Sequence, residues 1–122
     1  MDQRISSQSD ISNLFDAVTK IEKGKSIDSV VDHFPKIKRN FIFLILQEYY
    51  RQFENNNVIL KKFINIKTPK NIKTILKISL TLLFYSQKPE FAIVNEAVEF
   101  SKRFKNFNLV NAVLRKISHN KS

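Results

Sequence analysis

The sequence predicts an all-α protein in which about seven antiparallel helices pack as a bundle. The 122-residue chain contains only one Gly and three Pro, which disfavours a sandwich or barrel rich in turns. Apolar residues make up 43% of the chain, enough to form a hydrophobic core. They recur at spacings of three and four, the period of an amphipathic helix. We expect one helical domain over residues 10–122, after a flexible polar arm over residues 1–9.

The first helix is expected over residues 10–23, with Asp10 as its N-cap. Gly24, the only glycine, follows where the end of a helix favours a positive φ angle. A short helix is expected next, over residues 26–34. The residues expected to face the core from these two helices are Ile11, Leu14, Phe15, Val18, Ile21, Ile27, Val30 and Val31.

The third helix is expected to run from Pro35 to about Asn55, because proline is favoured at the start of a helix. It contains the run FIFLIL over residues 41–46, which by periodicity alone also fits a buried strand. The flanking segments contain no turn signal, and this favours a helix. Because a helix that is apolar on all sides needs neighbours on every face, we expect this helix at the centre of the molecule.

Three asparagines at residues 55–57 indicate a turn, and a short helix is expected after them over residues 58–64. Proline opens each of the next two predicted helices, over residues 69–86 and 89–104, and the last helix is expected over residues 108–118. The core-facing residues of these last three helices are expected to be Ile72, Ile75, Leu76, Ser79, Leu82, Leu83, Ile93, Val94, Ala97, Val98, Phe100, Phe104, Leu109, Val110, Val113, Leu114 and Ile117.

Positive charge is unevenly distributed along the chain, whose net charge is +10. Residues 1–54 contain eight acidic and eight basic residues, whereas residues 55–89 contain seven Lys and no acidic residue. Since sixteen of the 21 basic residues are Lys, codon usage in an AT-rich genome is one explanation of the charge, but it does not readily explain the asymmetry. A clustered positive field attracts phosphate backbones or acidic membrane surfaces.

Several classes of chemistry lack the residues they need. The chain has no Cys for disulfide or thiolate chemistry, and one Gly is too few for a phosphate-binding loop. His33 and His119 are isolated in the sequence, which disfavours a metal site or a catalytic triad. The N-terminus has no apolar signal segment, and the longest apolar run has six residues. We therefore expect a soluble, cytoplasmic protein without catalytic activity, cofactor, metal or membrane span.

The segments PEFAIVNEAVEFSKRF and FNLVNAVLRKI, residues 89–104 and 107–117, together resemble the signature of the NusB-like helical domain. That signature is a helix opened by proline with the pattern VNEAVELAK, then a short loop, then FVNAVLR. Residues 94–98 and Lys102 match its first part, and residues 109–115 match its second part. The segments ILKISLTLLFY and GKSIDSVVDHF also resemble helices of this family. The resemblance implies a NusB-like bundle, and it is strong over about residues 69–118 and loose over the rest of the chain.

The resemblance also implies a role, because the family has two main branches. One is the transcription antitermination factor, which binds a short RNA element together with a small-subunit ribosomal protein. The other is the N-terminal domain of the ribosomal RNA 5-cytosine methyltransferase. Ala112 and Arg115 are closer to the methyltransferase branch, yet the chain has neither the Cys nor the Gly-rich α/β domain of that enzyme. The Arg-rich N-terminal stretch of the antitermination branch is reduced here to Arg4.

The leading hypothesis is a non-enzymatic RNA-binding module acting in transcription antitermination or ribosomal RNA processing. The alternatives are a scaffold that holds a ribosomal protein, a polymerase partner or a second copy of itself, and an accessory subunit of a separately encoded methyltransferase. Basic residues in the last two predicted helices can also have a purely structural role. Arg115 and Lys116 can complement the dipole at the end of their helix, and Arg103 can pair with Glu99. The candidate RNA-binding residues are Arg4, Lys70, Lys73, Lys77, Lys102, Arg103, Lys105, Asn108, Arg115 and Lys116.

Overall fold

The structure, a computed structural model, describes residues 8–119. This part contains seven helices and no strand, so the all-α prediction is confirmed. The helices are α2 (Asp10–Glu22), α3 (Ile27–Val31), α4 (Lys36–Arg51), α5 (Phe53–Leu60), α6 (Lys70–Tyr85), α7 (Glu90–Ser101) and α8 (Phe107–His119).

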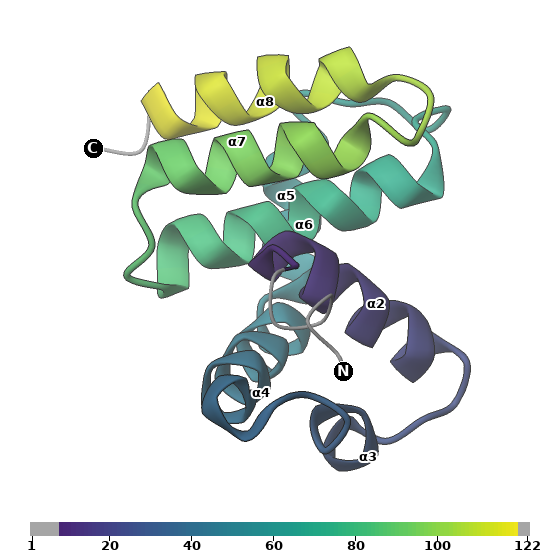
Figure 1. Ribbon diagram of the computed structural model, residues 1–122. Coiled ribbons are helices and arrows are strands. Elements are labelled where there is room, and N and C mark those ends of the chain that lie inside the picture. Colours follow the sequence, from purple (N-terminus) through teal and green to yellow (C-terminus); the bar gives the residue numbers. More distant parts are fainter. Residues whose placement is uncertain (1–7, 120–122) are drawn as a thin grey trace.

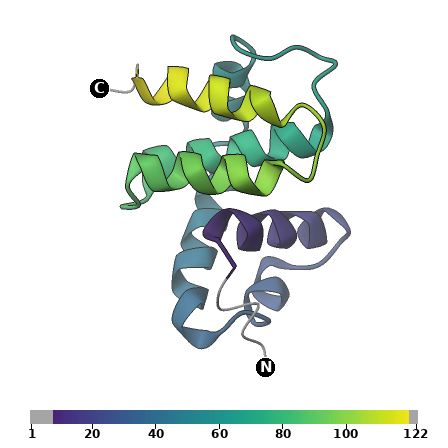
Figure 2. The same cartoon turned by 45° about the horizontal axis from the view of Figure 1, so that its top comes forward.

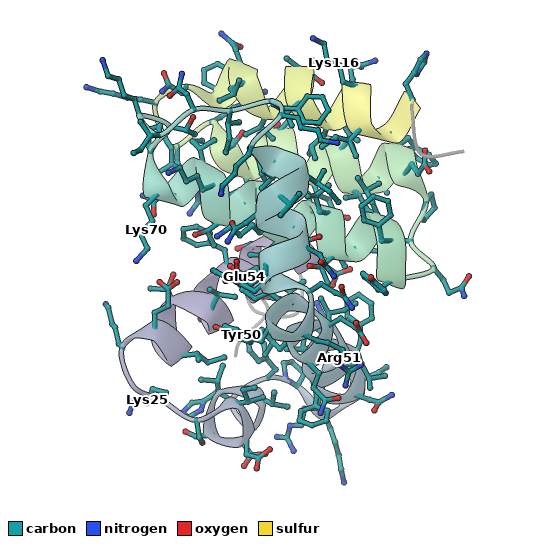
Figure 3. All side chains as sticks on the ribbon, turned by 180° about the vertical axis from the view of Figure 1, so that it is seen from behind. Lys25, Tyr50, Arg51, Glu54, Lys70 and Lys116 are labelled. Carbon is teal, nitrogen blue, oxygen red and sulfur yellow. The ribbon has the colours of Figure 1, made fainter. Side chains whose placement is uncertain are left out.

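The last three helices lie side by side, and each runs opposite to the one before it (Figure 1). Helix α2 crosses below them and contacts both α6 and α7 (Figures 1 and 2). Helix α3 packs against α2 and α4, and α4 also packs directly against α6. Seen from behind, α5 covers the face of α6 that points away from α7 (Figure 3). The predicted antiparallel packing is therefore confirmed for α6, α7 and α8.

Helix α6 is the centre of the molecule, with ten of its sixteen residues buried. It packs against α2, α4, α5, α7 and α8. Ile72, Ile75 and Leu76 are completely inaccessible to solvent, and burial of each such side chain contributes about 1.5–3 kcal/mol. Every residue that the sequence assigned to the core is buried or partly buried against it.

The prediction that the helix with the FIFLIL run is central was wrong. That helix is α4, which buries one face through Ile42, Ile45, Leu46 and Tyr49. Leu44, within the run, is 49% exposed, because a helical turn carries it to the opposite side. Apolar side chains are common on protein surfaces, so a short apolar run does not require neighbours on every face.

The predicted starts of the helices agree with the structure except for the N-cap of α2. Ser9 rather than Asp10 is the N-cap of α2, and its Oγ accepts a hydrogen bond of 3.1 Å from the backbone N–H of Ser12. Pro35, Pro69 and Pro89 each precede the first residue of a helix with extended ψ angles, so the predicted proline starts hold to within one residue. Gly24 has a φ of +106°, as expected after α2.

The predicted turn at the three asparagines was also wrong. Helix α4 ends at Arg51, and residues 55–57 lie inside α5, which ends at Leu60 instead of continuing to Ile64. Asn56 is buried, and its Nδ2 donates a hydrogen bond of 3.4 Å to Thr81 Oγ1 of α6. A partner on another helix satisfies the amide, so tertiary packing overrides the local preference of asparagine for turns.

Lys88, between α6 and α7, ties this connection to the start of α2. Its Nζ lies 2.8 Å from Asp10 Oδ2 and 2.9 Å from Glu96 Oε2. The three side chains are only 21%, 24% and 26% exposed, so the network is largely shielded from water. Burial lowers the pKa of Lys88, but its hydrogen bonds to Asp10 and Glu96 outweigh burial, and the pKa is raised above its usual value. The ammonium is therefore fixed in its charged form.

We predict that Lys88→Met lowers the free energy of unfolding by about 1–3 kcal/mol near neutral pH, because two shielded carboxylates lose their cation. The contribution of a group whose pKa is raised on folding is complete below its unfolded pKa and is lost as the pH rises through the folded pKa. As the pH is raised from neutral, the difference between wild type and variant should therefore persist until strongly alkaline pH. Urea unfolding followed by circular dichroism measures it.

Lys102→Met is the matched control for this prediction. Lys102 also forms an ion pair, 3.2 Å from Glu99, but both side chains are more than half exposed. An exposed pair of this kind contributes at most about 0.5 kcal/mol. Equal destabilisation by the two variants would contradict the special role of the Lys88 network.

Candidate nucleic-acid interface

Basic side chains from the start of α6 and from the segment between α7 and α8 lie at one end of the molecule. The antiparallel order places the start of α6, the end of α7 and the start of α8 at the same end (Figures 1 and 2). Five of the predicted RNA-binding residues therefore share this end, which we call the basic end: Lys70, Lys102, Arg103, Lys105 and Asn108.

The lysines of the basic end have only weak internal partners. Lys70 Nζ lies 3.3 Å from Glu22 Oε1 at the end of α2, and Lys102 pairs with Glu99. Both lysine side chains are mostly exposed, so solvent screens these pairs and each contributes little to stability. An incoming phosphate can therefore redirect these ammonium groups at low cost.

Arg103 is held differently from the lysines. Its guanidinium carbon lies 4.2 Å above the centre of the Phe100 ring, in a cation–π contact. Phe100 packs against Phe15 of α2 at 5.1 Å and against Phe104 at 6.0 Å between ring centroids. The predicted pairing of Arg103 with Glu99 is replaced by this contact, because Glu99 pairs with Lys102 instead. The aromatic cluster thus orients a guanidinium at the basic end.

The loop between α7 and α8 turns sharply at Asn106. Its φ of 68° is in the left-handed region, which asparagine tolerates better than most residues, and its carbonyl accepts a hydrogen bond of 3.1 Å from Leu109 N–H. Lys105 and Asn108 are exposed on either side of the turn, while Phe107 is half-buried. The turn therefore presents polar and basic side chains to solvent and keeps the aromatic ring closer to the core.

Lys73 and Lys77 point away from the basic end, toward α5. They belong to a pocket of about 280 Å³ between α5, the following loop and α6, which we call the lysine pocket. Lys77 Nζ lies 3.9 Å above the centre of the Phe53 ring. Lys70 is on the same face of α6, about 10 Å along the helix from Lys77, so a row of lysines joins the basic end to this pocket. The lining of the pocket is Asn57, Leu60, Lys61, Ile64, Asn65, Ile66, Lys73 and Lys77.

The environment of Lys77 disfavours its positive charge. Burial is the largest cause that lowers its pKa, and the charge of Lys73, with a smaller effect from Lys70, lowers it further. Glu22 and Glu54 oppose this shift but do not cancel it. The pocket therefore carries positive potential that the protein itself leaves incompletely neutralised.

The structure separates Arg115 and Lys116 from the basic end. Both line an open groove of about 600 Å³ between α7 and α8, together with Phe91, Val94 and Asn95. Lys116 and Lys70 lie far apart, as Figure 3 shows. Arg115 Nε donates a hydrogen bond of 2.9 Å to Asn111 Oδ1 on the same helix. The Asn111 side chain therefore orients the arginine within α8. Arg4 lies outside the described residues.

The sequence did not single out three polar residues of the lysine pocket: Asn57, Lys61 and Asn65. The sequence does contain one feature that points to them, because all three belong to the segment of residues 55–89 that has no acidic residue. The expected turn at residues 55–57 and the helix expected over residues 58–64 concealed it, because the structure instead has one helix over Phe53–Leu60 followed by a loop.

Two other kinds of site find no support in the described residues. Nowhere in residues 8–119 do three His, Cys, Asp or Glu side chains gather closely enough to hold a metal ion. Over the same range, no helix combines the length and apolar character needed to cross a membrane.

The seven described helices, of which α6 is buried at the centre, and the basic residues gathered at one end define a small all-α module with a cationic surface. A comparison with protein families matches the NusB family over residues 7–119. The chain belongs to the NusB family, as the motifs in its last two helices indicated. No curated protein and no solved structure matches it significantly.

We predict that the Nζ of Lys77 titrates below the ordinary lysine pKa of 10.5. Lys73→Gln should move this pKa upward, because it removes a like charge, and Glu54→Gln should move it further down, because it removes a favourable one. The ¹³Cε chemical shift of labelled lysine, followed against pH, reports the value. A Lys77 that titrates at or above 10.5 in the wild type would refute the description of the pocket.

Proposed function

We propose that the protein is a non-enzymatic RNA-binding module of the NusB type, acting in transcription antitermination or ribosomal RNA processing. The observation that carries this proposal is the gathering of Lys70, Lys102, Arg103 and Lys105 at one end of the molecule. The family membership of the chain supports the same role. Lysine and arginine at such a surface neutralise phosphates, which fixes the position of a strand.

The local chemistry favours a flexible, single-stranded RNA as the ligand. The cations of the basic end stand on α6 and on the segment between α7 and α8, so they match phosphates spaced along a bent strand. Asn108, at the start of α8, is an exposed amide that can donate to and accept from a base edge. Single strands expose these edges, whereas the deep major groove of an RNA duplex hides them.

A second candidate function is to hold a protein partner, and the groove between α7 and α8 favours it. Phe91 in this groove is 72% exposed, an unusual position for a large aromatic side chain. Arg115 and Lys116 flank it with positive charge. An apolar anchor beside cations suits an acidic protein surface, so RNA and a partner protein would occupy different faces.

We predict that the full chain binds a single-stranded RNA carrying an antitermination-type element more tightly than a scrambled RNA. If about six phosphates of a single strand are contacted, affinity should fall roughly 300-fold between about 50 mM and 200 mM salt. The double change Lys102→Gln and Arg103→Gln should weaken binding and reduce the salt slope by about 1.4, the value expected for two lost contacts on a single strand. Fluorescence anisotropy measures both quantities.

The matched control is the double change Arg115→Gln and Lys116→Gln, which removes the same charge from the α7–α8 groove. This control should bind RNA with a salt slope reduced by less than that of the first pair. Equal loss from both pairs would show that total charge, and not the basic end, determines binding. Weak binding that is equal for the two RNAs would move the conclusion to the protein-scaffold function.

A further inference from the structure

The lysine pocket differs from the basic end because it is a concave site with an apolar floor. Leu60, which is buried, and Ile64, which is half-buried, form part of its lining, and its surface is mainly apolar. Its volume of about 280 Å³ lies just below the usual range for small-molecule pockets. The pocket can therefore admit one flat group of the size of a nucleobase, but not a helix or a long peptide.

The charged side chains at this pocket favour a negatively charged ligand. Lys61, Lys73 and Lys77 contribute three ammonium groups, and none of the lining residues is acidic. Lys77 Nζ lies over the Phe53 ring, and Lys73 Nζ has a long contact of 3.5 Å to the carbonyl oxygen of Ile66. Glu22 and Glu54 offset the charge of Lys77 only in part, so a neutral apolar ligand would leave these cations incompletely neutralised. An apolar group with phosphates beside it satisfies both the floor and the lysines.

We propose that the lysine pocket receives one unstacked base of a bound RNA strand, with the neighbouring phosphates held by Lys61, Lys73 and Lys77. This inference rests on the proposed RNA-binding function and adds a second contact region to it. The row of lysines on α6 provides the path between the two regions, because Lys70 stands at the basic end and Lys77 at the pocket. A strand that crosses the basic end can follow this row to the pocket.

The rim of the pocket supplies polar groups for the edge of the base. Asn65 Oδ1 already accepts a hydrogen bond of 2.8 Å from Lys67 N–H, which leaves its Nδ2 group to donate. Asn57, one turn before Lys61, adds a second amide. The faces of the base would lie against aliphatic side chains, so this site would tolerate more than one base type.

The test uses short single-stranded RNA in which one base is replaced by 2-aminopurine, whose fluorescence rises when it leaves the base stack. We expect the rise with the wild-type full chain. Asn57→Phe should abolish the rise and weaken binding about tenfold, because a phenyl ring fills the pocket and the energy of one held base is lost. The matched control is Val58→Phe on the same helix, since Val58 is 59% exposed and does not line the pocket.

A second variant keeps the test decisive if Asn57→Phe folds poorly. Lys73→Gln leaves the pocket open but removes one cation, and it should reduce both the fluorescence rise and the salt slope. RNA binding without a fluorescence rise, and unchanged by Asn57→Phe and Lys73→Gln, would overturn the pocket inference and leave the RNA-binding function standing. Absence of any RNA binding by the wild type would overturn both.

Discussion

The burial of α6 is the constraint on which the rest of the structure depends. Five helices pack against it, and its apolar residues are used almost entirely by these contacts. Only a narrow strip of α6 remains for charged side chains, and Lys70, Lys73 and Lys77 occupy it. The same packing that builds the core therefore places a row of cations between the first turn of the helix and α5. Core packing therefore determines which positions of α6 can carry a charged side chain, but it does not require that these positions be lysine.

The two ends of the α6–α7–α8 layer differ in how their positive charges are neutralised. At the end where α6 leads into α7, Lys88 is neutralised by Asp10 and Glu96 in a shielded network that fixes the connection. At the other end, Lys70 and Lys102 have only exposed, screened partners, and Arg103 rests on an aromatic ring. The seven lysines of the segment without acids are thus not equivalent. Lys88 serves stability, whereas the others that face solvent remain open to an anionic ligand.

Much of the fold could be predicted from the sequence, because helical periodicity and proline positions report on local structure. The core faces of α6, α7 and α8 and the positive φ of Gly24 follow from such local rules. The central position of α6 and the burial of Asn56 depend on contacts between distant segments, which periodicity does not contain. The candidate site shows the same division. The sequence named most of its cations, but only packing separates Arg115 and Lys116 from the basic end and brings Lys61 to the lysine pocket.

We propose that RNA binds along the basic end and the lysine row. Amide hydrogen exchange followed by mass spectrometry, with and without saturating single-stranded RNA, tests it most directly, because it maps contacts without changing any residue. We expect slower exchange in two segments, residues 61–77 and 102–109, and little change in α4. Protection confined to α4 or to the groove between α7 and α8, or no protection at saturating RNA, would contradict it.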